Sequence, residues 1–259
     1  MLHVCVLASG SSGNCTYMAS KQTRLFIDAG LSFRETASRL ESIGVDLPTI
    51  DAVCVTHEHD DHTASLGILH RRSEVKLYAN AGTIEALQHG GKLKDLPWNV
   101  FTTGALFEIG DLSIHPFSVP HDSYDPVGFL VCSGHSKAGI VTDMGMATGL
   151  IRDRLRNCQT IVIETNHDEQ LLQDAARPWP LKQRIAGRQG HLSNQQAGQL
   201  VADIAGSELK VVFLAHLSSE CNRAELAIKT VRKALEKSGH YDVELKLTYQ
   251  DRASDMVAV

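Results

Sequence analysis

The segment that most constrains this chain is His57-Glu-His-Asp-Asp-His62, where three histidines and several acids fall within six residues. It directly follows residues 52–56, an apolar run that is typical of a buried strand. A strand that ends in a tight turn can direct such side chains into one pocket. Imidazole nitrogens and carboxylate oxygens are ligands of zinc and of manganese. The segment therefore predicts a metal site at a strand end.

The alternative is a polar surface turn that contains histidines by chance. Histidine makes up only 13 of the 259 residues, so three in this spacing would be improbable. The donors also exceed what one tetrahedral ion needs if it keeps a position open for water. This excess favours two adjacent ions.

The composition predicts one globular domain over residues 1–259. Hydrophobic residues make up 43% of the chain and charged residues 21%, which is ordinary for a folded protein. No apolar run approaches the roughly 20 residues needed to span a bilayer, and no cationic leader precedes the first apolar run. The six cysteines are scattered singly, without a CxxC pair. We therefore expect a cytoplasmic protein with reduced thiols and no membrane association.

The net charge of −5 argues against a nucleic-acid interface that covers the whole surface. An anionic substrate must then be held by local features. No feature of the sequence specifies an oligomeric state.

Short apolar runs alternate with amphipathic stretches, which is typical of a layered α/β domain. We expect strands at residues 2–8, 24–28, 52–56, 76–78, 160–164, 209–215 and 243–249, with mostly β structure between 98 and 142. We expect helices at residues 34–43, 64–70, 83–89, 194–205 and 223–237. Ser193 and Gln196 have the spacing of a capping box before the fourth of these helices.

The pattern formed by His57, His59, Asp61 and His62 resembles the HxHxDH signature of the metallo-β-lactamase superfamily. The resemblance implies an αββα four-layer sandwich of two mixed β-sheets with helices outside. It also implies further ligands at later strand ends, and the candidates are His121, Asp143 and His216. By the resemblance, one ion takes His57, His59 and His121, the other takes Asp61, His62 and His216, and Asp143 bridges them. Histidines that compete for these assignments are His115, His135 and His167.

The segment Gly190-His-Leu-Ser-Asn194 resembles the HST-type loop of phosphodiesterase branches such as transfer-RNA 3′-processing endonucleases. In those enzymes the histidine assists proton transfer together with a glutamate from an earlier strand end. The matching residues are His191 and Glu164. The alternative is that Ser193 only caps a helix and that His191 is incidental.

Three segments resemble the YycJ/WalJ-like (VicX-like) bacterial group over nearly the whole chain. They are residues 7–14, residues 26–30, and His216-Leu-Ser218 followed by Cys221-Asn222, where Cys221 replaces a more usual asparagine. The resemblance implies a 5′-to-3′ DNA exonuclease that uses a metal-bridging hydroxide and two ions of zinc or manganese. Asp61 would orient or deprotonate the water, and His191, supported by Glu164, would protonate the leaving oxygen. The 73 positions from Asp143 to His216 leave no room for a β-CASP insertion.

A small-molecule metallo-hydrolase that acts on a cyclic phosphodiester or a thioester is the alternative function. The intact ligand set argues against a binding protein with a vestigial site, and the absent leader argues against a secreted β-lactamase. DNA would be contacted through its phosphates without sequence preference, and RNA is the alternative substrate.

Candidate phosphate contacts are Lys182, Arg184 and Arg188, which we expect in a basic loop before His191. The turn at residues 9–14 could cradle a phosphate with its N–H groups or only connect two strands. Arg152, Arg154 and Arg156 are expected on an exposed helix face.

Overall fold

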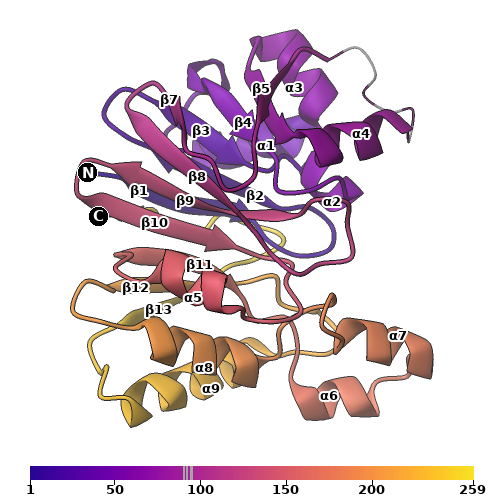
Figure 1. Ribbon diagram of the computed structural model, residues 1–259, viewed down its shortest axis with the longest axis vertical. Coiled ribbons are helices and arrows are strands. Elements are labelled where there is room, and N and C mark those ends of the chain that lie inside the picture. Colours follow the sequence, from indigo (N-terminus) through magenta and orange to yellow (C-terminus); the bar gives the residue numbers. More distant parts are fainter. Residues whose placement is uncertain (90, 92, 94–95) are drawn as a thin grey trace. The chain divides into compact units, whose positions relative to one another are not determined.

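The computed structural model describes residues 1–89, 91, 93 and 96–259, and the chain divides into two compact units (Figure 1). Unit 1 comprises Met1–Ser118, Ser123–Ser136 and Tyr249–Val259. Unit 2 comprises Val119–Asp122 and Lys137–Thr248.

A seven-stranded mixed sheet forms the centre of unit 1, in the order β14-β1-β2-β3-β4-β5-β6. Its strands are β1 (His3–Ala8), β2 (Cys15–Ala19), β3 (Arg24–Ile27), β4 (Ala52–Cys54), β5 (Lys76–Asn80), β6 (Trp98–Phe101) and β14 (Val257–Ala258). The pairs from β14 to β3 are antiparallel, and the pairs from β3 to β6 are parallel. The carboxyl ends of β3 to β6 therefore lie at one edge of the sheet.

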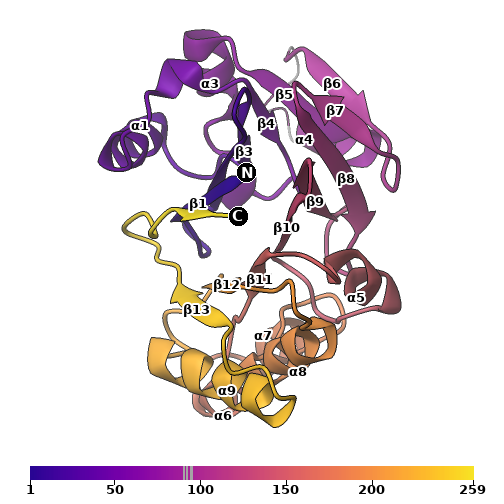
Figure 2. The same cartoon turned by 90° about the vertical axis from the view of Figure 1, so that its left-hand side faces the viewer.

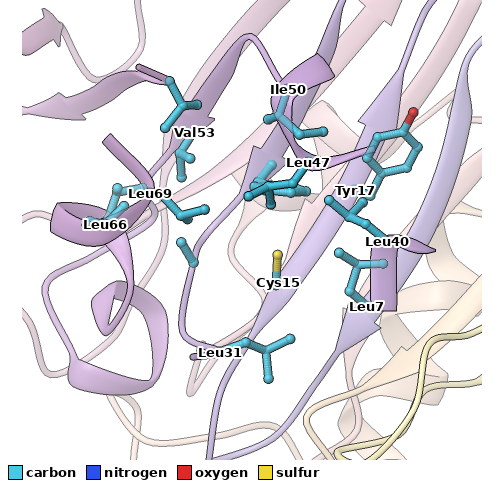
Figure 3. Close-up of a cluster of buried hydrophobic side chains, with 14 of the residues drawn as sticks. Leu7, Cys15, Tyr17, Leu31, Leu40, Leu47, Ile50, Val53, Leu66 and Leu69 are labelled. Carbon is cyan, nitrogen blue, oxygen red and sulfur yellow. The ribbon is translucent and has the colours of Figure 1, made fainter. Parts of the chain in front are cut away.

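Helices cover one face of this sheet (Figure 2). Unit 1 contains α1 (Phe33–Ser42), the 3-10 helix η1 (Leu47–Thr49), α2 (Asp60–Thr63), α3 (Leu66–Ser73) and α4 (Ala81–His89). Leu40 of α1 and Leu66 and Leu69 of α3 are buried in the same apolar cluster as Phe26 and Val53 of the strands (Figure 3). This burial provides the main stabilisation of the unit, because apolar area removed from water is the dominant favourable contribution to folding.

Three strands of the second sheet also belong to unit 1, namely β7 (Phe107–Ile109), β8 (Leu112–Ser118) and β9 (Val127–Ser133). They pair antiparallel in sequence order. Phe101 of β6 stacks on Phe107 of β7, with ring centroids 5.1 Å apart, and meets Phe129 of β9 edge to face. Within unit 1, aromatic contacts thus join strands of the two sheets.

The remaining strands of the second sheet belong to unit 2 and run in parallel: β10 (Ser136–Val141, from Lys137 on in unit 2), β11 (Thr160–Glu164), β12 (Val211–Ala215) and β13 (Glu244–Leu247). The helices of unit 2 are α5 (Gly149–Leu155), α6 (Glu169–Asp174), α7 (Trp179–Ile185), α8 (Asn194–Ile204) and α9 (Ala224–Lys237). Gly198 allows α8 to pack closely against α9, because a Cβ at that position would lie 3.2 Å from the Ala234 methyl group. The predicted capping box of Ser193 and Gln196 is present at the start of α8.

These elements confirm the predicted α/β class with two mixed sheets of seven strands and flanking helices. Strand β2 was not expected, and the helix expected at residues 64–70 corresponds to α3, which begins at Leu66 after the additional short helix α2. The expectation of a basic loop before His191 was wrong for Lys182 and Arg184, which lie on helix α7. Pro178 and Pro180 fix φ where this short helix begins, a position that tolerates proline. Within the described ranges, no helix is both long enough and apolar enough to cross a bilayer.

Candidate metal centre

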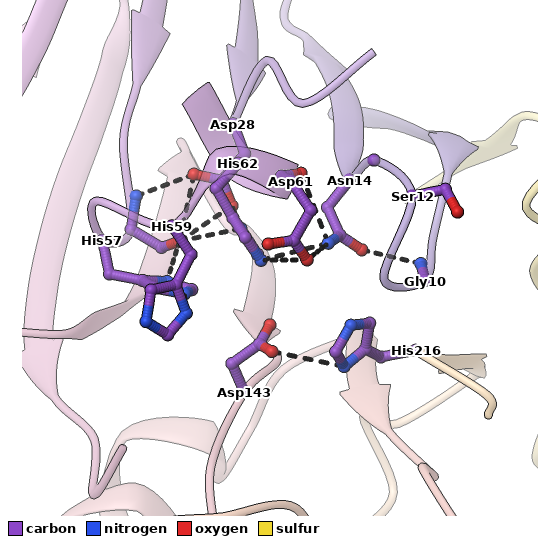
Figure 4. A network of polar contacts seen from close by, with 12 residues as sticks. Gly10, Ser12, Asn14, Asp28, His57, His59, Asp61, His62, Asp143 and His216 are labelled. Atoms are coloured by element: carbon purple, nitrogen blue, oxygen red, sulfur yellow. Dashed lines mark hydrogen bonds and ion pairs between the residues drawn. The ribbon is translucent and has the colours of Figure 1, made fainter. Parts of the chain in front are cut away.

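The first donor set lies in unit 1, at the carboxyl ends of the parallel strands β3 and β4. The chain leaves β3 through Asp28 and leaves β4 through Val55 and Thr56, so these segments are adjacent. The Asp28 carboxylate accepts hydrogen bonds from the Thr56 backbone N–H, at 2.8 Å, and from the Thr56 hydroxyl. These bonds fix the start of the turn that presents His57, His59, Asp61 and His62 (Figure 4).

The turn brings these four predicted donors together. The nitrogen atoms His57 Nε2 and His59 Nδ1 are 3.0 Å apart, and the His57 and His62 ring centroids are 4.1 Å apart. Two nitrogens that share a tetrahedral zinc ion at 2.0–2.1 Å would be separated by roughly 3.3 Å. Asp61 Oδ2 lies 3.4 Å from His62 Nε2. The donors of this set thus converge within unit 1.

Gly30 and Asn14 support the turn from neighbouring segments. A Cβ at Gly30 would lie 1.6 Å from the Asp61 carbonyl oxygen, so only glycine allows this close approach. The Asn14 backbone N–H donates to the same carbonyl at 2.7 Å, and its side-chain amide donates to Asp61 Oδ2 at 3.0 Å. Asn14 therefore holds both the backbone and the carboxylate of Asp61.

The second donor set lies in unit 2, where three parallel strands end at the same edge. Val141 of β10 pairs with Ile163 of β11, and Glu164 of β11 pairs with Ala215 of β12. Asp143 and His216 follow β10 and β12 within two residues and therefore lie beside Glu164. The ligand atoms of Asp143, Glu164, His191 and His216 all lie within 4.8 Å of one another.

Glu164 connects the members of this set. Its Oε1 lies 2.6 Å from His191 Nδ1 and 2.9 Å from His216 Nδ1. Its Oε2 accepts hydrogen bonds from the backbone N–H groups of Met144 and Leu192. The carboxylate is fully buried, and its bonds to ring nitrogens and backbone amides compensate for the loss of hydration.

The charges of this cluster shift its pKa values in opposite directions. Burial opposes ionisation of Glu164, but the charge and hydrogen bond of His191 and the hydrogen bond of His216 lower the pKa of the carboxyl to about 2. Burial likewise opposes protonation of His191, but Glu164 and Asp143 raise its pKa to about 9. The metal-free pair is therefore an imidazolium–carboxylate pair at neutral pH.

His121 also belongs to unit 2, in the segment after β8. Its ring centroid is 5.4 Å from that of His191, and its Nδ1 faces the Gly190 carbonyl oxygen at 3.3 Å. Burial lowers its pKa, which favours the neutral imidazole that binds metal.

Three donor-region residues have a left-handed backbone, which is costly for any residue except glycine. The φ angles are 63° at Asp28, 56° at Asp143 and 54° at His216. Each residue directly follows, or nearly follows, a parallel strand. Strain of this kind concentrates at functional sites, where the surrounding structure holds it in place.

The ring nitrogens test whether these residues suit a metal. In unit 1, His62 Nδ1 donates to the Asp28 carboxylate at 2.7 Å. In unit 2, Nδ1 of His121 faces a carbonyl and Nδ1 of His216 faces the Glu164 carboxylate. Such acceptors fix the tautomer with hydrogen on Nδ1, so the unprotonated Nε2 is the nitrogen that could bind metal; at His62 this nitrogen accepts a hydrogen bond from the Asn14 side-chain amide at 3.0 Å. The residues therefore fit a divalent metal.

Asp28 and Asn14 were missed as site residues, although both lie in segments that carried the family resemblance. A carboxylate at the end of a strand beside the histidine motif was the available signal. The phosphate-cradle interpretation of residues 9–14 was wrong, because the N–H groups of Ser9, Gly10, Ser12, Gly13 and Asn14 are bonded within unit 1. His167 is buried in unit 2, and no hydrogen bond to its Nδ1 is present in the described ranges.

The sequence model of the β-lactamase superfamily domain matches residues 23–216, so the chain belongs to this superfamily, in its metallo-β-lactamase branch. Within it, the chain is a YycJ/WalJ-like protein. It is 34% identical over 241 residues to the exodeoxyribonuclease YycJ of Bacillus anthracis, covering 92% of this chain and 90% of that protein. It is 35% identical over 229 residues to the exodeoxyribonuclease WalJ of Streptococcus pneumoniae serotype 2, covering 87% of this chain and 85% of that protein.

Solved structures confirm the predicted metallo-β-lactamase fold. The metallo-β-lactamase fold protein YhfI from Bacillus subtilis has a TM-score of 0.75 at 16% identity, covering 99% of this chain and 98% of that chain. Zinc-bound PqqB from Methylobacterium extorquens has a TM-score of 0.73 at 15% identity, covering 100% of both. Together with the donor sets, the family supports the use of divalent metal.

Proposed function

We propose that this protein is a metal-dependent nuclease that degrades DNA from the 5′ end. The observation that carries the proposal is the identity of 34–35% to two exodeoxyribonucleases over 85–90% of their lengths. The donor sets support it, because they supply the histidine and carboxylate ligands that such hydrolysis requires. RNA is the alternative polymer.

We propose that two divalent ions, zinc or manganese, bind the seven predicted ligands. His57, His59 and His121 would hold one ion, Asp61, His62 and His216 would hold the other, and Asp143 would be a ligand of both. Mixed imidazole and carboxylate ligands suit both metals. When bound, such ions activate a water molecule as nucleophile and neutralise charge on the phosphate.

The protein side chains then position and move protons. Asp61, held by Asn14, orients the attacking water or accepts its proton. His191 donates a proton from its imidazolium to the departing oxygen, and Glu164 keeps that imidazolium protonated and oriented. Such general acid catalysis contributes about 10²- to 10⁴-fold in rate.

We further propose that residues 1–259 act as one metallo-β-lactamase domain without a β-CASP insertion, in the cytoplasm. The thiols support a reducing compartment, since all six cysteines are free and five of them are buried.

The test is digestion of DNA and RNA, each labelled at the 5′ or the 3′ end, with manganese or zinc supplied to the chelator-treated protein. We expect release of the 5′ label as mononucleotide from DNA, and no release with chelator alone. Bis-p-nitrophenyl phosphate and a thioester are tested in parallel. Hydrolysis of only these small substrates would replace the nuclease with a small-molecule hydrolase.

The matched variants are His62→Ala and His89→Ala. His62 is a proposed ligand, whereas His89 is an exposed residue at the end of α4. We expect the first variant to lose metal and activity and the second to keep both. Equal activity of the two variants would contradict the ligand assignment.

A further inference from the structure

A cavity of about 170 Å³ lies beside His191 within unit 2. Its lining consists of Asp122, Arg177, Leu181, Arg184, Ile185, Gly190 and His191. The cavity has the volume of roughly five or six water molecules at about 30 Å³ each. This leaves space for a tetrahedral phosphate group but not for a whole nucleotide.

Two arginines of this cavity are held in place by carboxylates. Arg177 Nε donates to Glu220 at 2.8 Å, and Arg184 Nε donates to Asp122 at 2.5 Å. In the described part of the chain, the terminal nitrogens of both guanidinium groups make no further hydrogen bond. The planar fork of these nitrogens matches the oxygens of a phosphate.

The charge of the cavity favours an anion. The lining contains two arginines and one carboxylate, that of Asp122, which pairs with Arg184, whereas Glu220, the partner of Arg177, is not part of the lining. The Arg177 side chain is 26% exposed and that of Arg184 is 64% exposed, so Arg177 is the more desolvated contact. A desolvated guanidinium binds a phosphate more strongly than one in bulk water.

The proposed role of His191 fixes which phosphate would lie here. When a 5′-to-3′ exonuclease hydrolyses the first diester bond, water oxygen bonds to phosphorus and the bond from phosphorus to O3′ breaks. His191 transfers its proton to that O3′, so the terminal nucleotide is the leaving group and lies on the His191 side. The products are a nucleoside 5′-monophosphate with a free 3′-hydroxyl and a shortened strand with a new 5′-phosphate.

We propose that the cavity lined by Arg177 and Arg184 binds the 5′-terminal phosphate of the DNA strand. This inference rests on the proposed exonuclease function and names the strand end that the enzyme selects. It also explains how digestion continues, because each turnover produces the end group that the cavity binds.

The experiment compares 5′-phosphorylated and 5′-hydroxylated DNA of the same sequence, using the metal-loaded full-length protein and measuring kcat/KM. We expect the phosphorylated strand to be preferred by about 10- to 100-fold, which corresponds to one or two charged hydrogen bonds. The variants Arg177→Gln and Arg184→Gln should bring this ratio toward one, with the larger effect at Arg177. Arg156→Gln, which removes an exposed arginine from the end of α5, should leave the ratio unchanged.

The outcomes separate the two proposals. If wild-type protein degrades neither DNA, the exonuclease function itself is wrong. If it degrades the 5′-phosphorylated and the 5′-hydroxylated DNA at equal rates, the proposed terminal-phosphate site is wrong. The site is also wrong if the arginine variants lower the rates on the two DNAs by the same factor, because the arginines then contact an internal phosphate or none. Either result leaves the nuclease function intact.

Discussion

The two donor sets differ in how the chain encodes them. In unit 1 the donors are consecutive, from His57 to His62, and one turn after β4 presents them. In unit 2 the donors are dispersed. Asp143, Glu164 and His216 meet because β10, β11 and β12 are parallel and end at one edge, and the segment before α8 adds His191. In both units, however, donors follow the carboxyl ends of parallel strands, as His57 does after β4 and Asp143 does after β10, which is where α/β sheets commonly place their sites.

The support of the two sets differs as well. The local set depends on Asp28 and Asn14, which come from other strands and belong to no ligand motif. The dispersed set carries its own buried support in Glu164, which contacts His191 and His216 together. A compact motif therefore needs outside residues to orient it, whereas a dispersed set can share one carboxylate.

The largest expected effect separates a proton donor from a ligand. We expect His191→Ala to lower kcat on DNA by about 10²- to 10⁴-fold, the range for loss of general acid catalysis, while bound metal per chain stays unchanged. Metal is measured by elemental analysis of the purified variant. His62→Ala of the local set serves as the comparison and should lose metal.

His191 is close enough to Asp143 and His216 to be a ligand, so the opposite outcome is informative. Loss of one ion from His191→Ala would assign it to the metal, and the proposed proton transfer would then be wrong.

The second prediction concerns the stability of the metal-free protein against pH. The pKa of His191 in the folded protein is about 9, above its ordinary value of 6.5. Its contribution to the free energy of unfolding is therefore complete below pH 6.5 and is lost as the pH rises through 9. The folded pKa of Glu164 is about 2, below its ordinary 4.5, so its contribution is present above pH 4.5 and is lost as the pH falls through 2. The His191–Glu164 pair therefore stabilises the folded, metal-free protein most between pH 4.5 and 6.5.

Urea unfolding with a chelator at pH 6 and pH 9 measures this effect. Between pH 6 and pH 9, the free energy of unfolding of the wild type should fall by on the order of 3 kcal/mol more than that of His191→Gln. The reason is that the pKa of His191 lies about 2.5 above its ordinary value, and each pKa unit corresponds to about 1.36 kcal/mol. Parallel pH profiles for the two proteins would show that the imidazolium does not stabilise unit 2.

The same contrast explains how much the sequence could predict. The donors of unit 1 could be recognised because all of them lie within the six residues from His57 to His62. Most strands could be predicted from short apolar runs. Glu164 and His191 could be paired only through family resemblance, since 26 residues separate them along the chain. Their contact depends on the parallel register of β11 and on the start of α8, which no local pattern encodes.

Some site residues cannot be recognised from local sequence for a physical reason. Asp28 looks like an ordinary strand end until the neighbouring strand is known, because its partners Thr56 and His62 come from the next strand connection. Arg177 was not singled out, and Lys182 and Arg184 were expected in a loop. The prolines at the start of α7 do not exclude a helix, because proline is compatible with the first turn.

The third prediction tests the outside support of the local set. Asp28→Asn should weaken metal binding by about 10- to 100-fold, because the amide can donate to His62 Nδ1 and shift the ring hydrogen to Nε2. Competition with a chromophoric chelator measures the Kd. Asp46→Asn, at an exposed position before η1, is the matched control. Unchanged affinity of Asp28→Asn would mean that His62 is oriented without this carboxylate.

The smallest predicted effect tests the backbone strain that both sets share. Glu74 ends α3 at an exposed position with φ of 53°, close to the φ angles of Asp28, Asp143 and His216, but it contributes to no donor set. Glu74→Gly should raise the free energy of unfolding by about 1 kcal/mol, because glycine adopts this conformation without the clash of a Cβ. Urea unfolding of the two proteins measures the difference.

Glu74→Ala is the control, since it removes the same charge and keeps the Cβ. It should give no gain, and an equal gain in both variants would assign the effect to the charge instead of the backbone. A gain confined to glycine would establish the cost of this conformation at a position without a donor. Asp28, Asp143 and His216 bear the same conformational cost. Glycine at any of these positions would relieve the strain, but it would remove the side chain that supports His62 or that belongs to the donor set. The strained backbone is therefore retained at these strand ends because the site needs a side chain that only this backbone conformation directs into it.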